Sequence, residues 1–194
     1  MTRSAALLLP DRLISATELR SAALDGEVVP VGEGFLPIDT PVSALARAAS
    51  LAPLLIDERV VIADRSAAWV WGWGPEPAAV TTCVAITARI PSPDRRRLRA
   101  REVVIDDDER RMLGPVAVTT PLRTLLDLAR HDEDAAGDGL LAAGIRHHGI
   151  DKDALEAELT RRPSLSFVKT ARARLLAALA CAGEAQPDQP LLTR

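Results

Sequence analysis

The chain has 194 residues, enough for one or two compact domains, and 47% of these residues are hydrophobic. Twenty-four basic residues face 27 acidic ones, so the net charge at pH 7 is −3. Because phosphate contacts supply much of the affinity for DNA, this charge excludes a uniformly basic DNA-binding domain. No apolar run approaches 18 residues, which excludes a membrane-spanning helix from the expected elements.

The first part of the chain predicts two short helices with a hairpin between them. Residues 16–26 predict a helix with Thr17 as its N-cap. Residues 28–38 form two extended runs around Gly32-Glu33-Gly34, a pattern typical of a hairpin. The prolines in these runs exclude a central position in a sheet. Residues 41–52 predict an alanine-rich helix.

The rest of the chain changes from strands to helices. β-branched residues predict strands at 79–90, 102–106 and 115–119, and a turn lies between the last two. Helices are predicted at 121–130, about 135–147, 151–162 and 164–182. The polar residues 183–194 indicate a disordered tail. This order of elements predicts an α+β fold, with a small β-sheet packed against several helices.

The helix predicted at 121–130 has the clearest local signal. Thr120 is a suitable N-cap, and Pro121 occupies the first helical position, where its missing N–H costs nothing. Arg123 and Asp127 lie four residues apart, so they can pair on the helix. The functional alternative is that these two side chains line a site.

An arginine-rich segment between the first two strands is the best candidate contact for a polyanion. Such a segment would pair with phosphates rather than read bases. The alternative is a solvated loop whose charge is balanced by the acidic run 106–109. The candidate phosphate contacts are Arg95, Arg96, Arg97, Arg99 and Arg101.

No metal-binding or catalytic motif stands out. The adjacent His147 and His148 point about 100° apart on a helix, and no cysteine or carboxylate cluster completes a metal site. The two cysteines, Cys83 and Cys181, lack metal-like spacing and suit a reducing cytoplasm. We therefore expect a cytoplasmic protein without metal, cofactor or enzymatic activity.

Three segments together resemble proteins of the AbiEi type, the antitoxin-like transcriptional regulators of type IV toxin–antitoxin systems. They are VVIADRSAAWVWGW (60–73), GPVAVTTPLRTLLDLAR (114–130) and the β block with its arginine-rich turn, and the likeness extends over residues 41–182. The resemblance implies an N-terminal winged helix-turn-helix that binds operator DNA, followed by an α+β domain. In antitoxins of this family, that second domain is linked with neutralising a nucleotidyltransferase-like toxin.

The resemblance divides the chain into a reduced winged helix-turn-helix-like segment (1–40), an antitoxin-like α+β domain (41–182) and the tail. The recognition-helix contacts would be Thr17, Arg20 and Ser21. Residues 1–40 hold three arginines against six acidic residues, which weakens phosphate binding. The alternative function is therefore a protein-interaction module that has lost DNA binding, and a homodimer is a further possible partnership.

Some relatives continue into an endonuclease-like domain after a helix that resembles residues 170–182. The chain departs from that pattern after this helix, so the resemblance implies no nuclease activity.

The segment 64–74 holds all three tryptophans of the chain. Their alternation suits one face of a strand, but the resemblance favours a short helix that Asp64 caps and that ends at Gly72 or Gly74. On that helix Trp69 and Trp73 share a face and are expected in the core. Trp71 points elsewhere, so we expect it to be partly exposed and to contact a partner.

Overall fold

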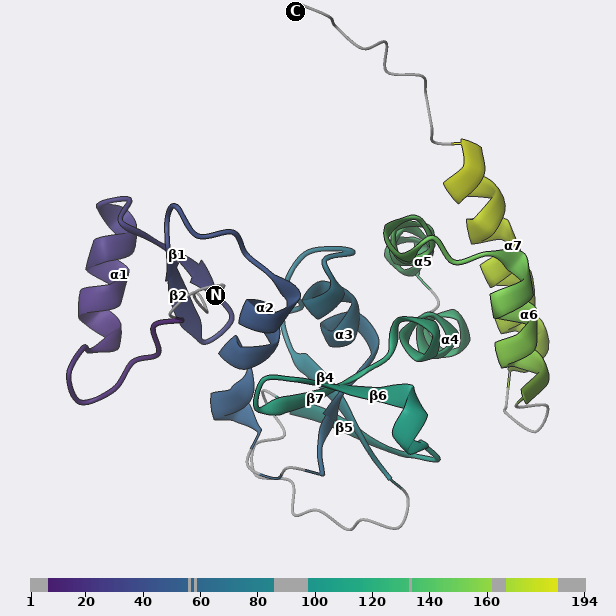
Figure 1. Cartoon of the computed structure of the whole chain (residues 1–194), viewed down its shortest axis with the longest axis horizontal. Coiled ribbons are helices and arrows are strands. Elements are labelled where there is room, and N and C mark those ends of the chain that lie inside the picture. The colour runs from purple at the N-terminus through teal and green to yellow at the C-terminus, as the bar shows by residue number, and fades with distance from the viewer. Residues whose placement is uncertain are drawn as a thin grey trace, which may run out of the picture. The chain divides into compact units, whose positions relative to one another are not determined.

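The computed structural model describes residues 7–55, 57, 59–85, 98–132, 134–161 and 167–184. The chain falls into two compact units, Met1–Thr120 and Pro121–Arg194. Helices occur in both units, and two open sheets occur in the first, as Figure 1 shows. The predicted α+β class is confirmed.

The first unit contains three α-helices and two sheets among its described residues. It begins with α1 (Ala16–Leu24), β1 (Val28–Val31), β2 (Gly34–Pro37), α2 (Ala44–Ser50) and a 3-10 turn, η1 (Ala52–Leu54). It continues with β3 (Val61–Ile62), α3 (Asp64–Trp71), β4 (Val80–Ala85), β5 (Leu98–Val103), a second 3-10 turn, η2 (Asp107–Glu109), β6 (Arg110–Leu113) and β7 (Val116–Thr119). The predicted hairpin is confirmed, whereas β3 and β6 were not predicted.

Helix α1 starts at a capping box. The Ser15 hydroxyl accepts a hydrogen bond from the Glu18 N–H, and the Glu18 carboxylate accepts one from the Ser15 N–H at 2.7 Å. The backbone N–H of Ser15 holds the pKa of Glu18 below its ordinary value, so this contact is lost as the pH falls through that lowered pKa. The prediction of Thr17 as N-cap is wrong, because the helix already begins at Ala16 and the Ser15 hydroxyl accepts the hydrogen bond of the free Glu18 N–H in its first turn.

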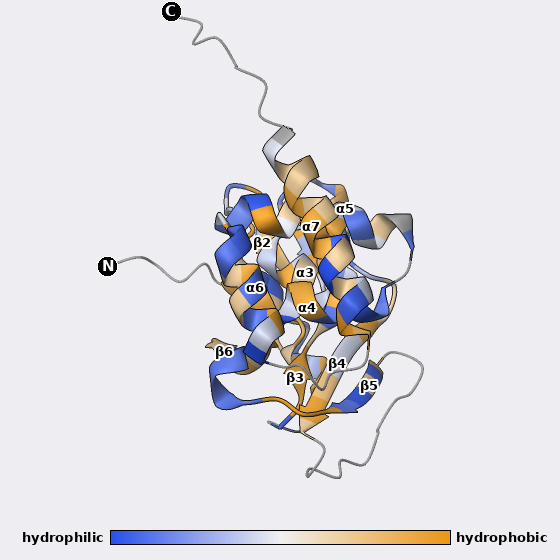
Figure 2. Cartoon of the chain, turned by 90° about the vertical axis from the view of Figure 1, so that its right-hand side faces the viewer, coloured by the Kyte–Doolittle hydropathy of each residue, from blue (hydrophilic) through white to orange (hydrophobic). Residues whose placement is uncertain are grey.

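The five-stranded sheet has the order β5-β4-β3-β7-β6. The short strand β3 lies at its centre, antiparallel to β4 and parallel to β7, and β4 is parallel to β5. Figure 2 shows the central strand β3 as hydrophobic and the edge strand β5 as largely hydrophilic, a composition that protects an edge from pairing with other chains. A buried cluster on one face of the sheet comprises Val61, Ala63, Cys83 and Ala117, with Val103 and Ile105 packed against it.

The second unit is helical in its described residues. Its elements are α4 (Pro121–His131), α5 (Ala135–His148), α6 (Lys152–Arg161) and α7 (Val168–Glu184). These helices match the four predicted ones with small shifts at their ends, and α7 packs against the other three. Helix α7 includes residues 183 and 184, which the sequence assigned to a disordered tail, and the rest of that predicted tail, residues 185–194, lies outside the described residues. No helix in the described ranges is both long enough and apolar enough to cross a membrane.

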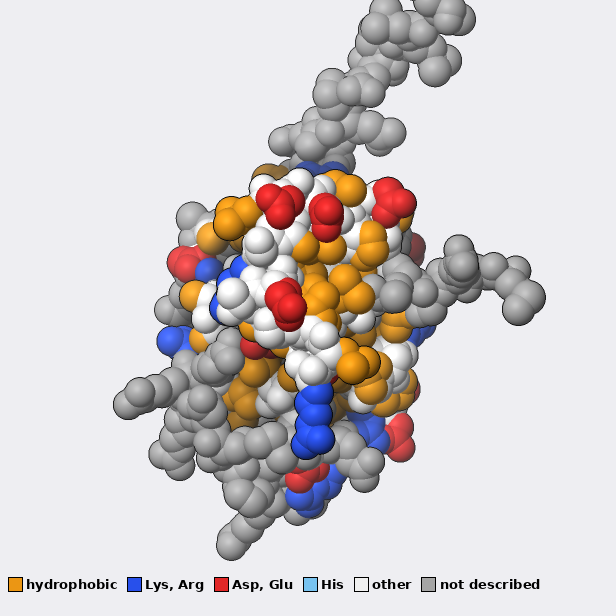
Figure 3. Space-filling view, turned by 90° about the vertical axis from the view of Figure 1, so that its left-hand side faces the viewer, with side chains coloured by type: hydrophobic (Ala, Val, Ile, Leu, Met, Phe, Trp, Pro, Cys, Tyr) orange, Lys and Arg blue, Asp and Glu red, His pale blue; other side chains and the backbone are white. Residues whose placement is uncertain are grey.

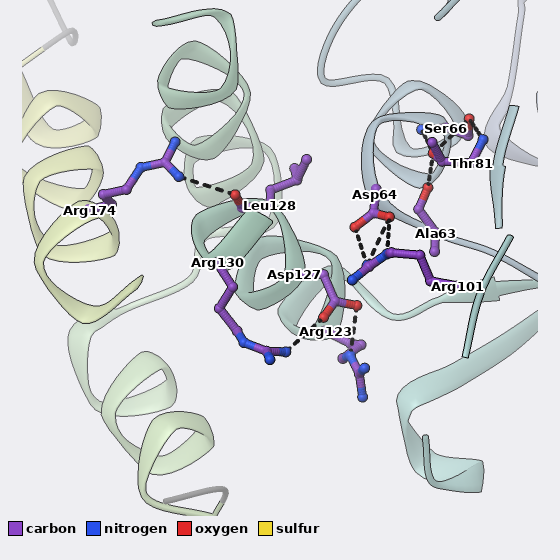
Figure 4. A network of polar contacts seen from close by, with 10 residues as sticks. All are labelled: Ala63, Asp64, Ser66, Thr81, Arg101, Arg123, Asp127, Leu128, Arg130 and Arg174. Atoms are coloured by element: carbon purple, nitrogen blue, oxygen red, sulfur yellow. Dashed lines mark hydrogen bonds and ion pairs between the residues drawn. The ribbon is translucent and has the colours of Figure 1, made fainter. Parts of the chain in front are cut away.

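One arginine of α7 connects three helices of the second unit. Its Nη1 donates to the carbonyls of Leu128 and Ala129 at 3.3 and 2.9 Å, within the last turn of α4 (Figure 4). The same residue, Arg174, donates through Nε and Nη2 to the Asp138 carboxylate on α5 at 2.9 and 2.6 Å. A cation at this position satisfies C-terminal carbonyls and favours the negative end of the α4 dipole.

Replacement of Arg174 by alanine is expected to destabilise the protein much more than the same change at Arg172. Arg172 lies on the same helix, and within the described ranges its side chain makes an exposed pair with Glu156 alone. In urea denaturation followed by circular dichroism, R174A should lower the free energy of unfolding by about 2 kcal/mol. The control R172A should lower it by less than about 1 kcal/mol. Equal losses for the two variants would contradict a connecting role for Arg174.

Candidate functional site

The three candidate recognition residues lie together on α1. Thr17, Arg20 and Ser21 are exposed and occupy one face, because residues three and four apart are neighbours on a helix. Leu24 extends this face and is 89% exposed. The opposite side of α1 buries Leu19 against the hairpin. The outward face of α1 is therefore a continuous accessible surface.

The predicted arginine cluster contributes less free charge than its sequence indicates. Arg95, Arg96 and Arg97 lie outside the described residues. Arg99 is exposed on β5, whereas the Arg101 guanidinium pairs with both carboxylate oxygens of Asp64 at 2.7 and 2.9 Å (Figure 4). Arg101 therefore stabilises the first unit by joining β5 to α3, and we no longer expect it to contact phosphates.

The Asp64 carboxylate serves this ion pair instead of capping α3. Ala63 is the N-cap residue and makes no side-chain cap, while Asp64 is the first helical residue and has a left-handed φ of 50°. Beside it, the Ser66 hydroxyl accepts from the Thr81 N–H at 2.8 Å, and the Thr81 hydroxyl donates to the Ala63 carbonyl at 2.8 Å. The prediction of Asp64 as a cap is wrong because β5 supplies a stronger, charged partner.

All three tryptophans are buried. Trp69 lies on α3, while Trp73 follows the left-handed Gly72 that ends the helix, so the predicted core positions and helix end are confirmed. Trp71 is only 7% exposed, and its indole N–H donates to the Thr119 carbonyl of β7 at 2.9 Å. The expectation of an exposed Trp71 at a partner surface is wrong, because a carbonyl 48 residues away satisfies its polar atom.

The hairpin turn is built into the first unit. The Gly32 N–H donates to the Glu76 carboxylate at 3.3 Å, and the Glu33 N–H donates to the Ser50 carbonyl of α2 at 3.3 Å. A Cβ at Gly32 would overlap the Ser50 hydroxyl and lie 3.4 Å from the Trp69 ring. A wing that contacts DNA projects from its domain, whereas this turn packs against α2 and α3. These contacts join the hairpin to residues beyond position 40 within the compact unit Met1–Thr120.

The accessible surface around α1 is apolar and acidic. Leu13 and Leu24 are 93% and 89% exposed, and Ile38 is also exposed. Figure 3 views this side of the unit and shows hydrophobic side chains between acidic ones at the top and basic ones below. The exposed charged residues near α1 include Arg12, Arg20, Asp25, Glu27 and Asp39. Within the described ranges, none of these five has an ion-pair partner.

The predicted pair on α4 is present and buried. Arg123 Nε donates to Asp127 Oδ2 at 2.8 Å, and Arg130 approaches the other carboxylate oxygen at 3.5 Å (Figure 4). Both Arg123 and Asp127 are almost completely inaccessible. Their burial favours a structural role over the lining of an accessible site.

Comparison with known proteins gives no assignment: no protein-family model matches the chain, and no curated protein matches it significantly. Among the described residues, no group of three or more His, Cys, Asp or Glu side chains is placed to hold a metal ion. The accessible surface of α1 and of the turns beside it, with the exposed Leu13 and Leu24 and with charged side chains that lack an ion-pair partner among the described residues, is the candidate functional site.

The close packing of the hairpin turn predicts different costs for two glycine substitutions. Gly26 and Gly32 both have a left-handed φ, but a Cβ at Gly26 would meet nothing within 4 Å. G26A should therefore cost only the backbone strain, about 1–2 kcal/mol. G32A should cost about 1–3 kcal/mol more because the methyl group overlaps Ser50. Urea denaturation of both variants measures the difference, and equal costs would show that the turn is free of α2.

Proposed function

We propose that the chain is a non-enzymatic, antitoxin-like regulator that acts through protein contacts rather than as a free-standing DNA-binding domain. The observation that carries this proposal is the accessible surface of α1 and the turns beside it, where the exposed Leu13 and Leu24 lie among acidic side chains that have no ion-pair partner in the described part of the chain. The resemblance of residues 60–73 and 114–130 to antitoxin-type regulators supports the class. It also supplies a candidate partner, a nucleotidyltransferase-like toxin. The two free cysteines agree with the cytoplasmic location that we propose.

Electrostatics favours a protein partner over DNA at this face. Lys and Arg side chains supply the electrostatic part of DNA affinity by neutralising phosphates, and acidic residues beside them repel the DNA backbone. Among the described residues, the exposed cations on or beside α1 are Arg12 and Arg20, whereas Asp25, Glu27 and Asp39 are exposed nearby. The hairpin turn, which would supply wing contacts, is occupied by Glu76 and Ser50.

Operator binding is a second candidate function, because Thr17, Arg20 and Ser21 do share one exposed helical face. A single helix of this kind fits the major groove of B-DNA. In that case Arg20 would supply the main charged contact, and its loss would remove most of the affinity.

DNA titration separates the two candidates. Fluorescence anisotropy should be measured with a labelled duplex from upstream of the gene and with a scrambled duplex, at 50 and 200 mM salt. We expect no saturable binding up to about 10 µM protein, because the local charge is acidic. Tight binding that weakens steeply with salt, prefers the upstream duplex and is lost in R20A would contradict the proposal and establish the operator function.

Co-expression tests the toxin contact. The chain should restore growth to cells that express a nucleotidyltransferase encoded beside its gene. Unchanged toxicity at matched protein levels would overturn toxin neutralisation. The G26A variant, which is expected to be less stable but keeps every leucine and charged side chain of the α1 surface, serves as a control for altered stability.

A further inference from the structure

Strand β6 forms one edge of the five-stranded sheet, and among the described residues no strand pairs with its outer side (Figure 2). It pairs antiparallel with β7, in a register that sets Arg111 against Val118. The Thr120 N–H donates to the Glu109 carbonyl at 2.8 Å, which makes these two residues a hydrogen-bonded pair of the same register. Hydrogen-bonded and non-hydrogen-bonded pairs alternate along an antiparallel ladder, so Arg111 bonds to β7 and its two neighbours do not.

The main-chain groups of Arg110 and Met112 therefore point away from β7. Each of these residues places its N–H and its C=O on the outer edge of β6, and within the described ranges these groups have no hydrogen-bond partner. The edge is accessible, since the Met112 side chain is 62% exposed. An accessible edge of this kind is a template on which an extended segment can add as a further strand.

The exposed side chains of β6 differ between the two faces of the sheet. Met112 lies opposite Ala117, a member of the buried cluster, so it extends the apolar face of that cluster to the edge. Arg111 points to the other face, is exposed, and makes no ion pair in the described part of the chain. Arg110, in contrast, is paired with Asp107. An added strand therefore meets an unpaired cation on one face and an apolar side chain on the other.

A second copy of β6 does not suit this edge. The register that pairs all outward main-chain groups of two β6 strands sets Arg110 of one copy against Met112 of the other. The same register places the two Arg111 side chains directly opposite each other, and like charges in that position are destabilising. The charge of the edge instead complements a strand that carries a carboxylate.

We propose that the outer edge of β6 binds an extended acidic segment of a partner protein, which adds antiparallel with a Glu or Asp side chain opposite Arg111. Residues of a non-hydrogen-bonded pair have the closest side chains in an antiparallel ladder, so this carboxylate lies near the guanidinium. The residues on either side of it exchange main-chain hydrogen bonds with Arg110 and Met112. An apolar side chain opposite Met112 packs on it, which favours a carboxylate between apolar residues.

The other edge strand lacks this selectivity. Strand β5 exposes both Arg99 and Glu102, so it favours neither an acidic nor a basic segment. The β6 edge is also separate from α1, and it binds its partner whether or not the proposed function of α1 holds.

An NMR titration of the full chain with a defined peptide tests the edge. The probe is acetyl-Thr-Val-Glu-Val-Thr-amide, whose glutamate lies opposite Arg111 when its valines pair with Arg110 and Met112. We expect saturable shifts of the β6 N–H signals below about 5 mM peptide, and slower solvent exchange of the Arg110 and Met112 N–H groups in the complex. The same peptide with N-methylated valines lacks the main-chain donors and should not bind. Absence of saturable binding by the first peptide, or equal binding by both, overturns the strand addition.

Charge exchange tests the role of Arg111. A peptide with lysine in place of glutamate should bind the wild-type chain about 5-fold more weakly, and R111E should reverse this preference. The control R99E changes an exposed arginine on the opposite edge strand and should leave both dissociation constants unchanged. A preference that R99E reverses and R111E does not would place the peptide on β5 and contradict the proposal.

A proline at position 112 tests the main-chain contact. M112P removes an outward N–H but no bond to β7, and edge strands tolerate proline at such positions. It should abolish peptide binding, whereas M112A keeps the N–H and should retain binding; circular dichroism confirms that both variants are folded. Equal affinities of the two variants would refute the main-chain pairing, and if M112P unfolds, the N-methylated peptide makes the same test.

The remaining outcomes concern the identity of the occupant. Protection of the Met112 N–H that rises with protein concentration, without peptide, would assign the edge to a second copy and overturn the acidic partner. None of these outcomes bears on α1, whose function is tested by the DNA and co-expression measurements.

Discussion

The first unit depends on the eight-residue helix α3, which contacts four other parts of the unit. Its first residue, Asp64, holds β5 through Arg101, and Ser66 binds the backbone of β4. The Trp69 ring lies against the hairpin turn, and the Trp71 indole binds the last carbonyl of β7. The rest of this core consists mainly of alanine and valine. Their small side chains cannot reach from α3 to the hairpin turn or to the end of β7. The large rings of Trp69 and Trp71 therefore fill the space between α3 and its neighbours. The indole N–H of Trp71 also fixes the orientation of α3 relative to β7.

This arrangement determines which surface remains for binding. The turn of the hairpin is used in packing on α2, and the guanidinium of Arg101 is used in holding β5. Helix α1 differs because it buries one leucine and leaves its other side accessible. The N-terminal part of the chain thus keeps a helix and a hairpin, but the hairpin has an internal role. Any binding function of this part is concentrated on α1.

The sequence predicted the elements whose signals are local. The hairpin follows from glycines between extended runs, and the first helix of the second unit, α4, follows from Thr120 and Pro121 at its start. Strand β6 has no such signal, because an edge strand carries arginines where a central strand would carry valines. Strand β3 is too short to show a period. The burial of Trp71 and the contacts of Arg174 depend on acceptors more than 35 residues away, which no local pattern records.

The tight turn at Gly32 also constrains how the sequence can diverge. The space for a side chain at position 32 is already filled by the hydroxyl of Ser50, which lies on a different element. A relative that acquires a side chain at position 32 must lose atoms at position 50 or release the turn from α2. These two positions are therefore expected to covary among homologues. Their joint state distinguishes chains with an internal hairpin from chains in which the hairpin projects as a wing.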